Sequence, residues 1–226
     1  MNLKKFAIIV AGGSGTRMNS SIPKQYLELN GLPILMHTIN AFYKASSTIQ
    51  IILVLPPHDI EFWKDMCTRY LFNVPVLVTE GGDSRYSSVK NGLNLIKTEN
   101  SIVIVHDGVR PLVTTDLILR SYKEAKLKGN AVACINLKDS IRMVKNGKNK
   151  SVDRAEYKLI QTPQAFLYPI LAKAYKNTNQ ENFTDDASVV EASGEAINLI
   201  EGDNKNIKIT TREDLYIASC FLGVRN

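Results

Sequence analysis

The amino-acid sequence predicts an α/β fold, namely a Rossmann-like, mostly parallel sheet with helices on both faces. Short runs rich in β-branched residues alternate along the chain with longer segments of helical spacing. The runs are apolar throughout, as expected for parallel strands that are buried on both faces. In such sheets ligands bind beyond the carboxyl ends of the strands, and a glycine-rich stretch follows the first run. We expect residues 1–226 to form a single domain.

The apolar runs and the segments between them define the expected elements. Strands are predicted at residues 5–10, 49–55, 74–78, 101–106 and 130–137. Two intervening segments have apolar residues at helical spacing: Leu35, Ile39 and Phe42 after Pro33, and Val89, Leu93 and Ile96 after Ser87-Ser88. The segment TTREDL, residues 210–215, has the spacing of a capping box and predicts the start of the last helix.

The composition limits the class of protein. A net charge of +6 admits nucleic acid as a partner, but equally a small polyanion such as a nucleotide. Because the basic residues are spread along the chain, we expect no nucleic-acid partner. The three cysteines, Cys67, Cys134 and Cys220, have neither a disulfide-framework nor a zinc-site spacing. We find no apolar run long enough for a secretory signal or a membrane span, so we expect no membrane partner and a cytoplasmic location.

The stretch AGGSGTRMNSSIPKQ, residues 11–25, follows the first predicted strand. It lacks the third glycine of the dinucleotide fingerprint and the Gly-Lys-Ser/Thr of a P-loop, which disfavours a dehydrogenase or a P-loop NTPase. Glycines let the backbone approach a ligand closely, and Arg17 and Lys24 lie near amides that can cradle phosphates. We therefore expect a triphosphate here, with a flexible strand-to-helix turn as the alternative.

The chain resembles the 2-C-methyl-D-erythritol 4-phosphate cytidylyltransferase family in six segments that occur in the family's order: AGGSGTRM…PKQY, EGGDSR, VHDGVRP, QTPQAF, FTDDASVVE and NIKIT. These segments extend from residue 7 to about residue 217. The resemblance implies a nucleotidyltransferase that transfers CMP from CTP to methylerythritol phosphate and releases pyrophosphate, in non-mevalonate isoprenoid precursor synthesis. It also implies Mg²⁺ as cofactor and a homodimer.

The matching motifs imply roles for individual residues. The cations aimed at the α-phosphate and the pyrophosphate would be Arg17, Lys24 and Lys208. The nucleotide would be bound by Ala11, Gly12, Gly13, Gly15, Gly82, Asp83, Ser88, Asp107 and Gly108. The acceptor, a small polyol phosphate, would be bound by Arg110, Ser140, Arg154, Thr162, Thr184 and Lys208.

Asp107 is the expected Mg²⁺ ligand. It is a hard oxygen ligand at the end of a predicted strand, and Mg²⁺ needs only one or two carboxylates when substrate phosphates supply other ligands. An aspartate that merely caps the turn before Pro111 is the alternative. We expect His106 to point back into the fold and to have no catalytic role. Nucleotidyl transfer depends on positioning and charge neutralisation more than on acid–base chemistry.

Four positions leave alternatives open. Thr184 also suits the cap of a helix that starts in TDDAS, and both roles are compatible. Gly108 and Val109 stand where the family usually has two alanines, and Ser140 where threonine is common. Valine at position 109 also occurs in the sister enzymes that transfer CMP to ribitol 5-phosphate, which makes ribitol-5-phosphate cytidylyltransferase the alternative function. A non-catalytic nucleotide- or RNA-binding protein is a more distant alternative.

A β-hairpin arm is predicted at about residues 138–156. Two extended segments flank Asn146-Gly147, a strong signal for a tight hairpin turn. Ile141, Met143 and Val144 would stay partly uncovered if this hairpin projected alone, because isolated two-stranded hairpins are marginal in water. The resemblance implies an arm that crosses to the partner of a homodimer, where Arg154 completes the neighbouring acceptor site. A hairpin folded back on its own domain is the alternative.

Overall fold

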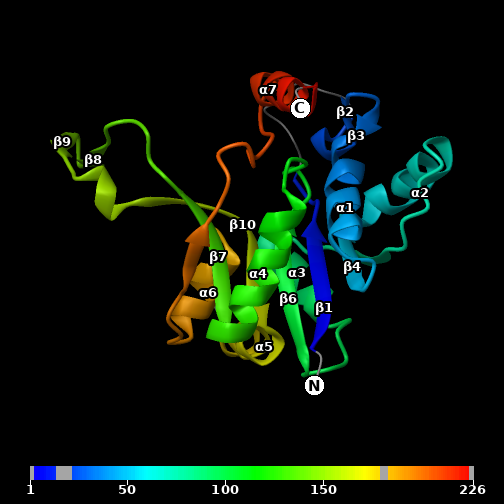
Figure 1. The fold of residues 1–226 in the computed structure, drawn as a ribbon, viewed down its shortest axis with the longest axis horizontal. Coiled ribbons are helices and arrows are strands. Elements are labelled where there is room, and N and C mark those ends of the chain that lie inside the picture. Colours follow the sequence, from blue (N-terminus) through cyan, green and yellow to red (C-terminus); the bar gives the residue numbers. More distant parts are fainter. Residues whose placement is uncertain (1–2, 14–21, 179–182, 224–226) are drawn as a thin grey trace.

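The computed structural model describes residues 3–13, 22–178 and 183–223. In this part of the chain a seven-stranded sheet has the order β11-β7-β10-β6-β1-β4-β5 (Figure 1). Its strands are β1 (Lys4–Val10), β4 (Ile49–Leu55), β5 (Leu77–Glu80), β6 (Ser101–Asp107), β7 (Asn130–Asn136), β10 (Lys158–Leu167) and β11 (Leu199–Glu201). β10 is antiparallel to β6 and β7, and the remaining pairings are parallel.

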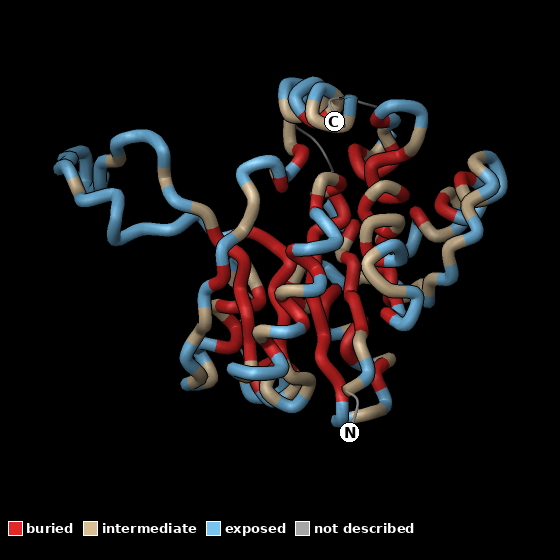
Figure 2. The backbone as a smooth tube through the Cα atoms, viewed as in Figure 1, coloured by how far each residue is buried: buried red, intermediate tan, exposed pale blue. Residues whose placement is uncertain are grey.

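Helices cover both faces of the sheet. One face carries α1 (Ile34–Ala45), α2 (Ile60–Arg69) and α4 (Thr115–Lys128), and the other α3 (Arg85–Leu93), α5 (Tyr168–Asn177) and α6 (Asp186–Ala192). Successive side chains of a strand point to opposite faces, so Ala7 and Ile9 enter one core while Phe6 and Ile8 enter the other. The strands are buried along most of their length (Figure 2). The predicted fold class is confirmed.

A small third cluster lies beyond the carboxyl ends of the parallel strands (Figure 1). It joins the two-stranded pair β2 (Glu28–Leu29) and β3 (Leu32–Pro33) to the last helix, α7 (Arg212–Gly223). Three short 3₁₀ turns complete the described elements: η2 (Lys24–Tyr26), η3 (Pro57–Asp59) and η4 (Arg154–Glu156). None of the helices described combines the length and apolarity that a bilayer crossing requires.

Four of the five predicted strands match β1, β4, β6 and β7 within one residue at either end. The prediction for the run at 74–78 is wrong in its bounds, because β5 starts at Leu77, opposite Ile52 of β4. Val74 and Val76 instead pack against the core on the α1 face. β10 was not predicted, because Pro163 lacks a backbone donor and makes its segment a poor candidate for a strand. The strand accommodates this proline with a register shift between Ile160 and Gln164.

The start of α3 differs from the prediction. The helix begins at Arg85, and Ser84 is its N-cap. The Ser84 hydroxyl accepts from the Ser87 amide at 3.0 Å, while the Ser87 hydroxyl accepts from the Ser84 amide at 2.9 Å. This reciprocal pair is a capping box, so Ser87 stabilises the first turn from inside the helix. Ile96 is buried but lies beyond the end of the helix.

Acidic side chains accept hydrogen bonds from backbone amides at the starts of α6 and α7. The prediction that Thr184 caps α6 is wrong. The cap is Asp185, whose carboxylate accepts from the Ser188 amide at 3.0 Å. The prediction for TTREDL is confirmed, since Asp214 accepts from the Thr211 amide at 2.8 Å while Thr211 accepts from the Asp214 amide at 3.3 Å. Both arrangements satisfy amides that would otherwise lack a partner in the first turn.

The predicted hairpin is confirmed and projects from the body of the molecule (Figure 1). β8 (Arg142–Lys145) pairs with β9 (Lys148–Ser151), and this two-stranded sheet pairs with no other described strand. Asn146 and Gly147 have φ angles of 50° and 74°, as a type I′ turn requires. Every residue of both strands is exposed, Met143 by 43% and Val144 by 71%.

Candidate active site

A cavity of about 290 Å³ lies where β1 and β6 end, at the edge of the sheet where ligands were expected. Three segments that are far apart in sequence meet there: the glycine stretch after β1, the turn before α3 and the end of β6. Predicted site residues that line it are Ala11, Gly12, Gly13, Lys24, Gly82, Asp83, Ser88, Asp107 and Lys208. Arg17 and Gly15, which were also predicted, lie outside the described residues.

The first glycines leave room that the described residues do not fill. A Cβ added at Gly12 would meet no atom of the described residues within 4 Å, although the residue lines the cavity. At Gly13 an added Cβ would meet only the side chain of Lys24, with Cε at 3.4 Å and Nζ at 3.8 Å. Lys24 is only 8% exposed, so its cation sits next to this stretch of backbone. The arrangement suits an anion that approaches the backbone closely.

We expect Gly12→Ala to leave thermal stability unchanged and to raise the KM for the nucleotide about tenfold, the scale of one lost polar contact. No described residue packs against this position, so we expect a methyl group there to meet the ligand. Melting temperature and initial rates at varied nucleotide concentration are the two measurements. Gly223→Ala, at the end of α7, is the control for alanine in place of an exposed glycine. An unchanged KM in Gly12→Ala would contradict close approach at this position.

The glycine turn before α3, at Gly81 and Gly82, forms another wall of the cavity. The Gly82 amide donates to the Ser88 hydroxyl at 3.1 Å, and the Gly81 amide donates to the Leu55 carbonyl at 2.7 Å. A Cβ at Gly82 would collide with the Ser87 hydroxyl, so the turn requires glycine there. A second cavity, of about 480 Å³, shares Gly12, Gly13, Gln25, Gly82, Asp83 and Ser88 with the first. The two together offer an elongated site bounded by backbone groups.

Asp107 is the charged centre of the site. Its Oδ2 lies 3.2 Å from both Arg110 Nε and Lys208 Nζ, and its Oδ1 lies 3.8 Å from Arg85 Nε. The Asp107 amide donates to the Thr162 hydroxyl at 3.0 Å, which fixes the end of β6 against β10. The side chain is 10% exposed. Asp107 thus lies among three cations, of which Arg85 and Lys208 also line the cavity.

These cations determine the ionisation of Asp107. Burial alone would raise the pKa of the Asp107 carboxyl, but Lys208, Arg85 and Arg110 outweigh burial and hold it well below its ordinary value. Burial lowers the pKa of His106 to about 3, so this side chain is neutral near pH 7. The His106 ring lies against Phe42 at a centroid distance of 5.1 Å. The prediction that His106 points back into the fold is confirmed.

Sequence reasoning missed Arg85 and Asp186. The motif EGGDSR contains Arg85, yet only the glycines, Asp83 and Ser88 were assigned roles. Arg85 lines the cavity, and its Nη2 donates to Asp186 Oδ2 at 2.6 Å. A usable signal was present, because an arginine in the first turn of a helix is unfavourable for the helix dipole and so calls for another reason.

The predicted acceptor residues divide into two groups. Arg110 and Thr162 contact Asp107, but neither lines the cavity, and Thr162 is only 4% exposed. Thr184 is exposed just before α6. Ser140 and Arg154 are exposed on the arm, which extends away from the body of its own chain (Figure 1). Gly108 lies behind the cavity, where an added Cβ would be 3.0 Å from both Ala11 Cβ and Leu35 Cδ1.

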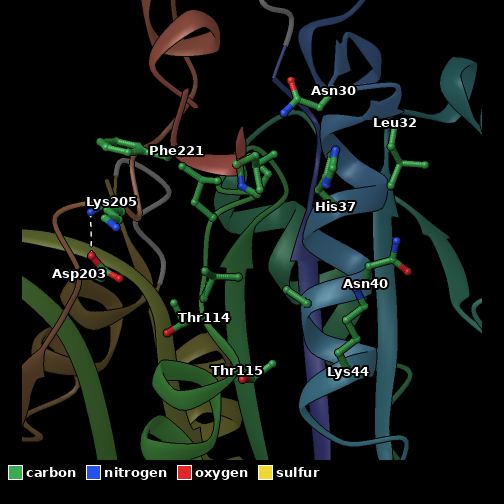
Figure 3. Close-up of a pocket in the computed structure, with 15 residues that line it drawn as sticks. Asn30, Leu32, His37, Asn40, Lys44, Thr114, Thr115, Asp203, Lys205 and Phe221 are labelled. Atoms are coloured by element: carbon green, nitrogen blue, oxygen red, sulfur yellow. Dashed lines mark hydrogen bonds between the residues drawn. The ribbon is translucent and has the colours of Figure 1, made fainter. Parts of the chain in front are cut away.

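A larger cavity, of about 630 Å³, lies elsewhere and shares no lining residue with the Asp107 cavity. Figure 3 shows its walls, with His37, Asn40 and Lys44 on α1 facing the start of α4 at Thr114 and Thr115. Lys205 and Phe221 close another side. No residue of the predicted site lies in this wall, so its size does not make it the active site.

Comparisons with known proteins agree with the motifs. Residues 6–224 match the 2-C-methyl-D-erythritol 4-phosphate cytidylyltransferase family. A protein of that name from Bacteroides thetaiotaomicron is 47% identical over 220 residues, which cover 97% of this chain and 100% of the relative. The one from Azobacteroides pseudotrichonymphae is 48% identical over 221 residues, covering 97% and 99%. The crystal structure of the Francisella tularensis protein has a TM-score of 0.80 and 31% identity, covering 96% and 99%.

Proposed function

This chain belongs to the 2-C-methyl-D-erythritol 4-phosphate cytidylyltransferase family, and from that premise we propose how its site transfers CMP from CTP to 2-C-methyl-D-erythritol 4-phosphate. The observation that carries the proposal is Asp107, an ionised carboxylate set among Arg85, Arg110 and Lys208 in a glycine-walled cavity. A merely turn-capping aspartate would have no need of three cations around it. This arrangement disfavours that alternative.

The chemistry is an in-line displacement at phosphorus. A phosphate oxygen of the acceptor forms a bond to the α-phosphorus of CTP while the bond to the bridging oxygen of the β-phosphate breaks, and pyrophosphate leaves. We assign Lys24 and Lys208 to the negative charge that grows on the transferred and leaving groups. Lys208 suits this role because its ammonium stays 3.2 Å from Asp107 while 42% of its side chain remains exposed. Arg17 keeps the same proposed role.

Magnesium fits this site as a cation shared between protein and substrate. No group of three or more His, Cys, Asp or Glu side chains gathers in the described ranges to hold a metal alone. Asp107 supplies a single ionised carboxylate, and among the described residues its Oδ1 is approached by one cation, Arg85 Nε at 3.8 Å. Mg²⁺ in such sites takes its other ligands from phosphates and water, and it would neutralise charge on the triphosphate. Asp107 is therefore the residue we assign to hold it.

The acceptor is the part of the function that most needs a direct test. We expect kcat/KM for 2-C-methyl-D-erythritol 4-phosphate to exceed that for ribitol 5-phosphate by at least about 10²-fold, since a site that hydrogen-bonds one polyol discriminates strongly against another. Pyrophosphate release from CTP, measured with each acceptor and with none, decides it. A preference for ribitol 5-phosphate would leave cytidylyl transfer intact and overturn the acceptor. No release with either would overturn the enzyme.

We also propose a homodimer in which the arm of one chain reaches the site of the other. Met143 and Val144 on the arm, and Tyr157, Leu159 and Ile160 at its base, are all at least 40% exposed. A projecting hairpin with this much uncovered apolar surface is explained by a second copy that covers it. A two-fold axis would make the exchange mutual, so that Arg154 and Ser140 serve the acceptor site of the neighbour.

The remaining proposals concern the location of the protein and its partners. We propose a cytoplasmic location, which the state of the cysteines supports because Cys67, Cys134 and Cys220 are all free thiols. We propose CTP and a polyol phosphate as the small-molecule partners, and neither nucleic acid nor membrane as a partner. The spread of the basic residues along the sequence supports the first of these two exclusions.

A further inference from the structure

Arg85 connects two carboxylates that belong to different parts of the site. Its Nη2 lies 2.6 Å from Oδ2 of Asp186, and its Nε lies 3.8 Å from Oδ1 of Asp107. Asp107 ends β6 on the nucleotide side, whereas Asp186 starts α6, two residues after Thr184 on the proposed acceptor side. The guanidinium is 23% exposed and lines the cavity. One side chain thus spans the two halves of the site.

Asp186 is held from behind by a chain of buried groups. Its side chain is fully buried, and its Oδ1 accepts from the Tyr175 hydroxyl at 2.6 Å. The Tyr175 ring stacks on that of Tyr86, with a centroid distance of 4.7 Å and an interplanar angle of 12°. The Tyr86 hydroxyl in turn donates to the Tyr175 carbonyl at 2.7 Å. Both oxygens of Asp186 are therefore fixed, and they leave Arg85 one orientation.

Attachment of α6 does not explain this ion pair. Gln164 already fastens the start of the helix, because its Nε2 donates to Asp185 Oδ2 at 3.0 Å and its Oε1 accepts from the Ala187 amide at 2.8 Å. Val189 and Val190 bury the inner face of α6. A buried ion pair contributes little stability compared with apolar residues of the same shape. The pair thus costs desolvation without being needed as an anchor.

We propose that Asp186 and Tyr175 are positioning residues, which hold the Arg85 guanidinium against Oδ1 of Asp107 and so fix the carboxylate that serves CTP. The proposal rests on the role proposed for Asp107. Loss of the contact with Asp186 would let the Arg85 guanidinium leave Oδ1 of Asp107 and turn toward solvent, and the nucleotide side would lose its geometry. The acceptor side would be affected only through movement of α6 itself.

The first test separates these two effects kinetically. We expect Asp186→Asn to lower kcat/KM for CTP about 10- to 100-fold, the usual scale for loss of a group that orients a ligand-binding residue, with the KM for the acceptor nearly unchanged. Loosening of α6 would instead raise the KM for the acceptor, because Thr184 adjoins this helix. Tyr175→Phe should give a smaller loss of the same kind. A loss confined to the acceptor KM would overturn the proposal.

The second test removes the fold as an explanation. Arg85→Met combined with Asp186→Leu replaces both charges by apolar groups, so it should restore the melting temperature that Asp186→Asn loses. We expect this double variant to leave kcat/KM for CTP as low as in Arg85→Met alone. Asp186→Asn added to Arg85→Met should cost less than about a further threefold in kcat/KM. Recovery of activity together with stability would show that the pair is structural. If Asp107→Asn proved fully active, the proposed role of Asp107 would fail instead.

Discussion

Asp107→Asn is expected to lower kcat by on the order of 10³-fold, the upper range for loss of one preorganised electrostatic group. The amide keeps the size of the side chain but removes the charge that balances Lys208, Arg110 and Arg85 at 3.2, 3.2 and 3.8 Å. The cations would then repel one another, and the ammonium of Lys208 would lose the partner that places it. The proposed metal ligand would be lost as well. Pyrophosphate release under saturating substrates measures the effect.

Stability must be measured beside the activity of this variant, because removing one member of a buried charge cluster also destabilises the fold. Thermal unfolding of the variant shows at which temperatures it is folded, and its activity is measured at one of these. Glu124→Gln is the matched control, since it removes a carboxylate paired with Lys128 at 3.0 Å on α4, and it should leave the rate unchanged. EDTA should abolish the wild-type reaction, and added Mg²⁺ should restore it. Full activity of Asp107→Asn, or wild-type turnover in EDTA, would refute the assignment.

Most of the sheet could be predicted because its strands are buried on both faces. After Lys5, the run FAIIV has no polar residue, since Phe6 and Ile8 face one core and Ala7 and Ile9 the other. The signal fails at the sheet's edge and at its antiparallel strand. At the edge, Val74 and Val76 are apolar because they pack against the core from the irregular segment before β5. In β10, Pro163 suppresses the strand pattern although the neighbouring strands hold the segment in place.

The site could be predicted only as far as its motifs are local in sequence. The glycine stretch and Asp107 each follow a strand, and parallel strands bring their carboxyl ends to one edge, so their meeting was foreseeable. The contact between Arg85 and Asp186 joins residues 101 positions apart, and neither side chain belongs to a recognisable pair. Its existence depends on how α3 and α6 pack on the same face. The spacing of residues within a short segment does not predict how two distant helices pack.

Arg154→Ala is expected to lower kcat/KM for the acceptor about 10²-fold while leaving the melting temperature unchanged, the scale of a lost charge-assisted contact to phosphate. Arg154 is exposed on η4 at the base of the arm, and its Nη1 donates to the Lys138 carbonyl within the same arm. Arg154 lines neither the Asp107 cavity of its own chain nor the cavity that adjoins it. The variant alone therefore shows that the residue matters without showing which chain it serves.

Co-expression of Arg154→Ala with Asp107→Asn identifies that chain. If Arg154 acts across a two-fold axis, a mixed dimer has one site in which an intact Asp107 faces an intact Arg154 from the partner, and a second site that lacks both. Random pairing makes half of the dimers mixed, so about a quarter of wild-type activity should return although each variant alone is nearly inactive. Different affinity tags on the two chains allow the mixed dimer to be purified and its activity measured directly. Verified mixed dimers without recovered activity would place Arg154 in the site of its own chain, and a monomer in sedimentation analysis would remove the premise.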